Sequence, residues 1–361
     1  MEIYIMLYLS IIFIGIFSDR EVLNINNKAI INPNTLLFGF TGLLFLLAAI
    51  RKGIGTDYYL YKGIYNSQSE EMFELGWVYS MLSDFLRFLA VDYQFLIAIN
   101  SLIFLSVIYY FIKTFSYYKY ISLVTLLGTY MYFTSYNTFR QMTSIAIVLI
   151  ALILFNTQKK KIIGVLVFII SVGLHKSSIM FLPLFLLYYV KLSKLLYATI
   201  MIICLIAFIV IPESIKNQIF GFVINANEFF NDKYAGSTFV QGEERGIANK
   251  VFFLFYWSIS MILVVKNNEQ NNNHSWIEQS FLLYFIVNSF LPYSDVVGRI
   301  SMFFELLIIV IIPKFIFLQR TEYVRNILKI AVIIIFFVRL LYVLFLNGGE
   351  VVPYKSILNL H

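Results

Sequence analysis

The chain has 361 residues, of which 60% are hydrophobic, 18% aromatic and 13% charged. An ordinary soluble domain is about one quarter charged, so these proportions exclude that class and indicate a polytopic, all-α membrane protein. The net charge of +7 does not indicate nucleic-acid binding, because the lysines occur in short clusters between apolar runs, the pattern that sets membrane orientation.

A helix needs about 20 mainly apolar residues to cross a bilayer, and fewer when it packs inside a bundle. We expect about twelve such spans within one integral membrane domain over residues 1–361. We read the first as a retained membrane helix, because no cleavage site follows it. The expected spans cover residues 3–17, 36–50, 93–112, 121–136, 138–155, 162–174, 177–190, 195–211, 248–265, 276–291, 298–317 and 327–346.

Residues 76–90 have a different pattern. Polar residues at 80, 83, 84 and 87 recur at helical spacing opposite the apolar residues at 77, 81, 85 and 88. This predicts an amphipathic helix that lies in the membrane interface with its polar face toward water.

The lysines and arginines of the short loops predict the orientation. More than half of them fall in alternate loops, which are therefore expected to be cytoplasmic. The segments at 51–92 and 212–247 and the tail from Asn347 then form extracytoplasmic loops. The cytoplasmic set is Arg20, Lys28, Lys113, Lys119, Lys159, Lys160, Lys161, Lys191, Lys194, Lys266, Lys314, Arg320, Arg325 and Lys329.

The stretch RKGIGTDYYLYKGIY, residues 51–65, begins where the second apolar run ends. Its glycines permit a tight turn that can present Thr56 and Asp57 at the mouth of the bundle, and its tyrosines offer rings and hydroxyls to a sugar. No strand precedes the glycines, so a nucleotide-binding loop is not indicated. Arginine and tyrosine also gather at helix ends as lipid anchors, but an anchor does not need the Asp57 carboxylate.

The stretch TSYNTFRQMTS, residues 134–144, predicts a tight turn between two spans. It places Arg140 in the first turn of the second helix, beside Gln141. A guanidinium there can bind phosphate oxygens in bidentate fashion, and the helix N-terminus adds positive potential. The alternative is an arginine that reaches toward lipid headgroups.

The stretch GLHKSSIMFLP, residues 173–183, lies between two short spans, which are tolerated where they line a cavity. His175 can accept a proton or donate a hydrogen bond, because imidazole titrates near neutral pH. The alternative is a plain turn residue, which we expect of His274 and His361. The neighbouring lysine and serines favour a functional His175.

The stretch PYSDVVGRISMFFE, residues 292–305, opens the eleventh span and carries Arg299. If the helix begins early, Arg299 pairs on its surface with Asp295, four residues before it. Glu305 and Arg339 are expected to lie deep in adjacent helices, where they form a buried structural pair.

These motifs, taken in order, resemble the EpsG family of bacterial polysaccharide polymerases, which is related to the Wzy polymerases of O-antigen and capsule. The order of G-T-D-Y, R-Q and H-x-S carries the resemblance more than any one block. Leu75 stands where the family often has proline. The matching blocks are RKGIGTDYYLY at 51–61, ELGW at 74–77, FRQ at 139–141, LHKSS at 174–178, GRISMFFE at 298–305 and VVPY at 351–354.

The resemblance implies a multi-pass glycosyltransferase of the GT-C type in the bacterial cytoplasmic (inner) membrane, with its active site on the periplasmic or exterior side. Its substrates would be oligosaccharide repeat units linked to undecaprenyl pyrophosphate, and its partners would include a chain-length regulator and a flippase. A substrate with its lipid in the bilayer and its sugars in water agrees with a site at the outer membrane surface.

The resemblance also implies roles for individual residues. Arg140 and Arg299, with Arg51 behind them, would hold the pyrophosphate, and Asp57 or His175 would take the proton of the acceptor hydroxyl. No cofactor is expected. No metal is expected either, because the sequence shows no cluster with ligand spacing, and the one alternative is a metal ion held by Asp57 and Glu74. The residues expected to position the sugars are Tyr58, Tyr61, Glu74 and Gln141.

Two other functions fit parts of this pattern. A ligase that moves finished glycan to another acceptor, such as lipid A core, needs similar arginines and a histidine. A flippase for the same lipid-linked unit would show weak internal repetition and charges at the midplane of the bilayer. The charges expected here gather at the outer mouth instead, which favours a polymerase.

Overall fold

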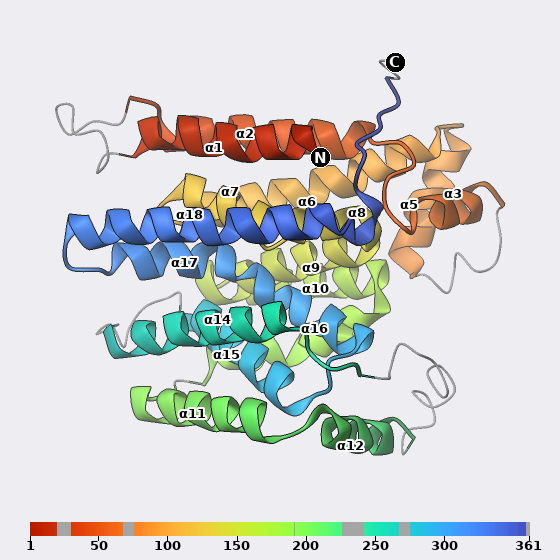
Figure 1. The fold of residues 1–361 in the computed structure, drawn as a ribbon. Coiled ribbons are helices and arrows are strands. Elements are labelled where there is room, and N and C mark those ends of the chain that lie inside the picture. Colours follow the sequence, from red (N-terminus) through yellow and green to blue (C-terminus); the bar gives the residue numbers. More distant parts are fainter. Residues whose placement is uncertain (20–29, 68–75, 191, 226–241, 267–274, 359–361) are drawn as a thin grey trace. The chain divides into compact units, whose positions relative to one another are not determined.

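A computed structural model describes residues 1–19, 30–67, 76–190, 192–225, 242–266 and 275–358 (Figure 1). These residues form helices joined by turns, which confirms the all-α prediction. The pairing of extended segments within the described ranges is limited to one isolated bridge between Arg51 and Ser356. The chain divides into two compact units, unit 1 of residues 1–185 and 309–361 and unit 2 of residues 186–308.

Unit 1 is a helical bundle around two buried helices. α7 (Lys119–Gly128) is buried along almost its whole length, as is α9 (Phe139–Leu152), which continues as the π-helix η1 (Ile153–Thr157). Apolar helices that expose one face surround them. The other helices of unit 1 are α1 (Glu2–Ser18), α2 (Pro33–Ile50), α3 (Tyr58–Ser67), α5 (Trp77–Phe88), α6 (Tyr93–Phe115), α8 (Met131–Asn137), α10 (Lys161–Leu174), α17 (Ile308–Phe317), α18 (Glu322–Phe345) and the short η3 (Gly348–Glu350).

Unit 2 contains α11 (Lys194–Val210), α12 (Glu213–Asn225), α14 (Ile247–Lys266), α15 (Ser275–Phe290) and α16 (Asp295–Leu306). The axes of α11 and α12 are bent by 106°. A buried carboxylate supports the bend, because Glu213 accepts hydrogen bonds from Lys216 at 3.0 Å, from Arg245 at 3.1 Å and from the Tyr293 amide at 2.9 Å.

Six helical segments within the described ranges are long and apolar enough to cross a membrane, or seven if the bent pair is one span. Shorter apolar helices accompany them, including α1, α7 and α10. The protein is therefore a multi-pass membrane protein, and the count of twelve spans stays a prediction. The six segments are Pro33–Ile50, Tyr93–Phe115, Phe139–Thr157, Ile247–Lys266, Asp295–Phe317 and Glu322–Phe345.

The structure corrects three predicted boundaries. The span expected over 121–136 is two helices, α7 and α8, because Tyr130 adopts a left-handed conformation with φ 70° between them. The loop expected over 212–247 contains the helix α12. The span expected from 298 begins at Asp295 instead, because the Ser294 side chain caps the helix there.

One short predicted span has an unusual geometry. Residues Lys176–Tyr188, which form η2, are in a 3-10 helix with Pro183 inside it. A 3-10 helix rises about 2.0 Å per residue, whereas an α-helix rises about 1.5 Å. The segment therefore reaches further through a bilayer than an α-helix with the same number of residues.

The two ends of the unit 1 bundle differ in chemistry. At the end predicted to be cytoplasmic, the Asp19 carboxylate accepts a hydrogen bond from Lys329 at 2.6 Å and another from Tyr120 at 3.0 Å. The Lys329 ammonium also lies 4.1 Å from the centre of the Tyr118 ring. This buried ion pair joins α1, α7 and α18, and the turn between α2 and α3 lies at the opposite end (Figure 1).

We predict that Asp19→Asn lowers the free energy of unfolding by about 3–5 kcal/mol, because it leaves the Lys329 charge buried without its carboxylate. The pair of changes Asp19→Leu and Lys329→Met removes both charges and should restore most of the loss. Thermal unfolding in detergent measures this. Asp84→Asn is the matched control: it breaks the exposed Arg87–Asp84 pair and should cost less than about 1 kcal/mol. Equal losses for Asp19→Asn and Asp84→Asn would contradict the prediction.

Candidate active site

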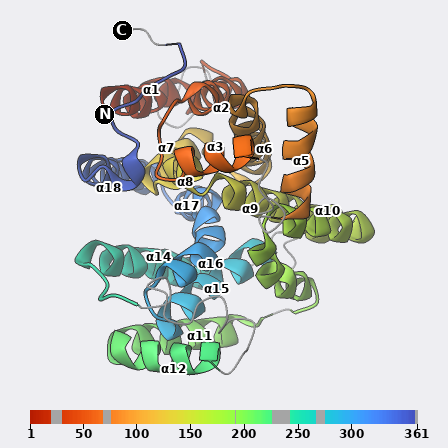
Figure 2. The ribbon, with the colours of Figure 1, turned by 90° about the vertical axis from the view of Figure 1, so that its right-hand side faces the viewer.

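The loop that joins α2 to α3 is paired with the carboxy-terminal segment of the chain. The Lys52 amide donates to the Lys355 carbonyl at 3.0 Å, and the Ile357 amide donates to the Ile50 carbonyl at 2.8 Å. The segment that contains VVPY thus lies against the segment that contains GTDY, at the end of unit 1 where Figure 2 shows α3 and α5.

Arg51, at the base of this loop, points into the protein and is 1% exposed. Its guanidinium donates to the carbonyls of Ala48 and Tyr136, each at 3.2 Å, and lies 4.4 Å from the centre of the Tyr136 ring. Burial lowers the pKa of Arg51. These contacts hold the backbone of the loop in place, and a role in pyrophosphate binding stays a prediction.

Arg140, in the first turn of α9, lies close to two tyrosine rings. Its guanidinium donates to the Tyr61 hydroxyl at 2.8 Å and lies 4.8 Å from the centre of that ring. The Tyr79 ring is 5.1 Å away. Tyr61 comes from α3 and Tyr79 from α5, so one arginine on a buried helix joins both helices of the 51–92 segment through cation–π contacts. Burial raises the pKa of Tyr79, which keeps its hydroxyl neutral.

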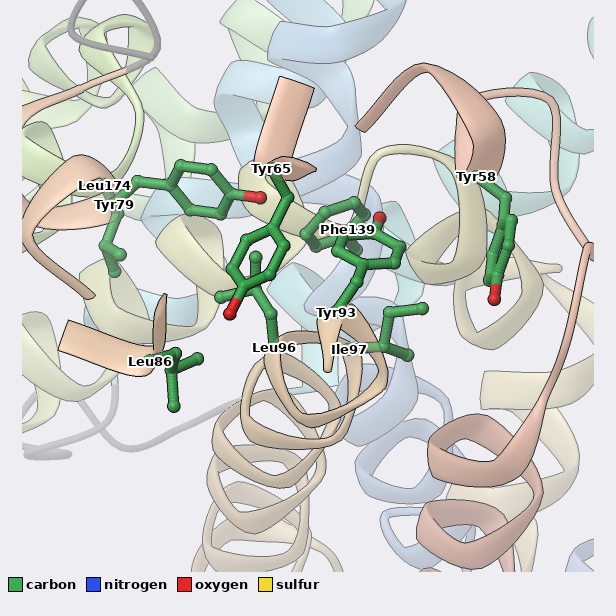
Figure 3. Close-up of a cluster of buried hydrophobic side chains, with 9 residues drawn as sticks. All are labelled: Tyr58, Tyr65, Tyr79, Leu86, Tyr93, Leu96, Ile97, Phe139 and Leu174. Carbon is green, nitrogen blue, oxygen red and sulfur yellow. The ribbon is translucent and has the colours of Figure 1, made fainter. Parts of the chain in front are cut away.

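A buried aromatic cluster supports these contacts. In Figure 3, side chains from α3, α5 and α9 gather over the first turns of α6. Phe139, next to Arg140, packs against the Tyr61 ring at 4.8 Å between ring centres. The cluster consists of Tyr58, Tyr65, Tyr79, Leu86, Tyr93, Leu96, Ile97, Phe139 and Leu174.

The two tyrosines predicted to position sugars have different surroundings. Tyr58 is 5% exposed and packs against Tyr93, which leaves its ring little surface for a ligand. Tyr61 is half-buried and holds Arg140. The neighbouring Tyr59, 70% exposed, offers a sugar more of its ring than either. Their contacts with sugars stay predictions.

The helix predicted over 76–90 is present as α5, but Ser83, predicted on the polar face toward water, is buried and donates to the Tyr79 carbonyl at 2.9 Å. Trp77, Met81, Phe85 and Phe88 are exposed, whereas Tyr79, Ser83 and Leu86 form the face that packs on the protein. The helix runs across the end of the bundle (Figures 1 and 2). An exposed apolar face on a crosswise helix agrees with a position in the membrane interface, which stays a prediction.

His175 follows the last residue of α10, in a turn that is tied to α9. Its Nδ1 is 2.7 Å from the Ser177 hydroxyl. The next serine, Ser178, is hydrogen-bonded to the Ser144 hydroxyl, which also donates to the Ser171 carbonyl at 2.7 Å. Ser144 lies one turn after Arg140 on α9, so these bonds hold the histidine turn beside the arginine turn.

The structure therefore brings several predicted residues to the same end of unit 1. Asp57 is one helical turn from Tyr61, because its carbonyl accepts the Tyr61 amide at 3.1 Å, and Tyr61 holds Arg140. Phe139 and Leu174, the neighbours of Arg140 and His175, share the aromatic cluster. Gln141 is buried on α9. The catalytic roles of these residues stay predictions.

Two predicted site residues are not placed with this group. Glu74 lies outside the described residues. Arg299, on α16, is exposed and belongs to unit 2. Across the described ranges, no three histidine, cysteine, aspartate or glutamate side chains come together as ligands for a metal ion.

Sequence analysis missed three residues that organise this end of the bundle. Gln94, on α6, donates to the carbonyls of Ala49 and Arg51 at 2.5 and 2.9 Å and accepts from Tyr58 at 3.4 Å. Tyr79 contacts Arg140, and Asn137 accepts the Thr56 amide at 2.9 Å. Asn137 lies in the turn that carries Arg140, which was the one signal in the sequence for its importance.

This is a multi-pass helical membrane protein in which Asp57, Arg140 and His175 lie with several tyrosines at one end of a bundle that is built on two buried helices. The chain belongs to the EpsG family, whose model it matches over residues 34–356. No curated protein and no solved structure matches it.

We predict that Tyr61→Phe lowers the free energy of unfolding by about 1.5–3 kcal/mol, because it removes a hydrogen bond to a charged group and keeps the ring. Chemical denaturation in detergent measures the change. Tyr59→Phe removes a hydroxyl from an exposed neighbour on the same helix and should change stability by less than about 0.5 kcal/mol. A Tyr61→Phe protein as stable as Tyr59→Phe would show that the bond to Arg140 contributes nothing.

Proposed function

We propose that this protein is a glycosyltransferase that polymerises oligosaccharide repeat units linked to undecaprenyl pyrophosphate, as a Wzy-type polymerase of surface polysaccharide, at the extracytoplasmic face of the cytoplasmic membrane. The observation that carries the proposal is Arg140, held by Tyr61 and Tyr79 at the end of the bundle that also presents Asp57 and His175. Membership of the EpsG family supports the same class of reaction.

In the proposed reaction, the hydroxyl of one lipid-linked unit attacks the anomeric carbon of a glycan on a second lipid. The bond from that carbon to the pyrophosphate oxygen breaks as the new glycosidic bond forms. The hydroxyl proton passes to Asp57 or His175, and the undecaprenyl pyrophosphate leaves with the bonding electrons. Negative charge therefore develops on the leaving group, where a preorganised guanidinium is most effective.

Arg140 can supply the positive charge that stabilises this leaving group. It is 7% exposed and bound to the Tyr61 hydroxyl, so a pyrophosphate oxygen would take the place of this hydroxyl on the guanidinium. Tyr61 and Tyr79 orient the guanidinium through one hydroxyl and two rings. Pyrophosphate binding by Arg299, which belongs to unit 2, stays a prediction. The lipid would reach the site past the exposed apolar face of α5.

We predict that purified protein converts lipid-linked repeat units into a ladder of polymers, and that Arg140→Ala lowers the rate about 100-fold or more because it removes a stabilising charge from the transition state. Lys52→Ala, an exposed cation one residue from Arg51, is the control and should polymerise at the wild-type rate. An Arg140→Ala protein that folds normally and polymerises at full rate would overturn the assignment of Arg140.

We also predict the glycan profile of a deletion strain. Loss of a polymerase leaves single repeat units on the final acceptor. Loss of a ligase leaves full-length chains stranded on the carrier lipid, and loss of a flippase leaves units on the cytoplasmic face, out of reach of external glycosidases. Gel analysis of surface glycan with enzyme accessibility separates these outcomes, and either of the last two would contradict a polymerase.

A further inference from the structure

Asn137, the last residue of α8, lies between the loop that carries Asp57 and the carboxy-terminal turn at Gly349. Its Oδ1 accepts the Thr56 amide at 2.9 Å. A Cβ atom added to Gly55 would lie 2.5 Å from that Oδ1, and one added to Gly349 would lie 2.1 Å from the Asn137 Nδ2. The Asn137 amide group therefore fills the space between two glycine backbones. A side chain at either glycine position would occupy that space.

The conformation of both glycines supports the same conclusion. Gly55 has φ +99° and Gly349 has φ +71°, which are left-handed values that a residue with a Cβ adopts only with strain. The Gly55 amide also donates to the Glu350 carbonyl at 3.3 Å. The loop and the carboxy-terminal turn are therefore fitted to each other and to Asn137 at once.

Asn137 is connected to both Asp57 and Arg140 of the candidate site. Toward Asp57, the Thr56 hydroxyl donates to the Asp57 carboxylate at 3.3 Å, and the Thr56 amide is bound to Asn137. Toward Arg140, Thr138 is both the C-cap of α8 and the N-cap of α9, so Asn137 and Arg140 flank one turn. A displacement of the Asn137 side chain would move the carboxylate relative to the guanidinium.

We propose that Asn137 is a positioning residue of this site, and that the carboxy-terminal turn at 347–350 is part of the active site because it holds Asn137 and the Thr56–Asp57 loop in register with Arg140. This inference rests on the proposed polymerase function. Asn137 does not touch the reacting atoms, so its effect falls on the rate of the chemical step rather than on the binding of substrate.

The test measures kcat and KM of purified protein with lipid-linked repeat units. We expect Asn137→Ala and Gly349→Ala to lower kcat by about 10- to 100-fold with KM changed less than about threefold, because a displacement of about 1 Å costs on that order. Asn137→Asp keeps the acceptor for the Thr56 amide and should retain more activity than Asn137→Ala. Gly63→Ala is the control: it adds a methyl group on α3 where nothing lies within 4 Å, and should behave as wild type.

Hydrogen exchange of residues 50–57 and 347–357 reports on the register of the loop without relying on activity. Exchange should rise in Asn137→Ala and Gly349→Ala and stay unchanged in Gly63→Ala. Faster exchange with wild-type kcat would make Asn137 a structural residue only and overturn the inference. Wild-type protein that forms no polymer would instead overturn the proposed function, so the two failures are distinguishable.

Discussion

The hydrogen bond from Arg140 to Tyr61 is the interaction on which the candidate site depends. It joins a buried helix of the bundle to a short helix in the segment that follows α2, and Tyr79 adds a second contact from α5. Hydrocarbon supplies no hydrogen-bond partners, so irregular backbone gathers at the ends of the spans. The contacts of Arg140 fasten that irregular segment to the rigid bundle, which is what a site for precise chemistry requires.

The two ends of unit 1 use charge in different ways. At the lysine-rich end, Asp19 and Lys329 form a buried pair whose charges cancel. At the opposite end, Arg51 is held by backbone carbonyls and Arg140 by tyrosines. The first arrangement stabilises packing between helices. The second fastens loops to helices through neutral groups, and the orientation predicted from the lysine clusters stays a prediction.

Much of the helical fold could be predicted from the sequence, because apolar runs of spanning length have few alternatives in a membrane. The ranges of α1, α2, α6, α10 and α18 agree with prediction to within a few residues. Local breaks could not be predicted. Tyr130, which is left-handed, donates from its hydroxyl to the Gly348 carbonyl at 2.7 Å, a contact with a residue more than two hundred positions away that the local sequence does not show.

Contacts between residues far apart in the chain also limit how much of the candidate site the sequence can predict. Asp57, Arg140 and His175 could be predicted from their immediate neighbours in the sequence, and that signal is local. Gln94 and Asn137 are ordinary polar residues whose importance depends on backbone groups brought to them by α2 and by the carboxy-terminal segment. The VVPY block could be noted as a motif, but its pairing with the GTDY loop depends on the closed bundle.

A comparison of two buried arginines shows why the contact of Arg140 with Tyr61 matters for the proposed function. In unit 2, Arg245 donates to the Glu213 carboxylate and to Asn288, and Lys216 shares that carboxylate. An arginine bound in this way is committed to a structural bond, since an incoming anion would have to displace a charged partner. A phenol hydroxyl is displaced at a lower free-energy cost, and the two rings still fix the plane of the guanidinium. The Tyr61 hydroxyl is therefore a neutral contact of Arg140 that an anion can displace, which is the property that the proposed transfer of a glycan from a pyrophosphate uses.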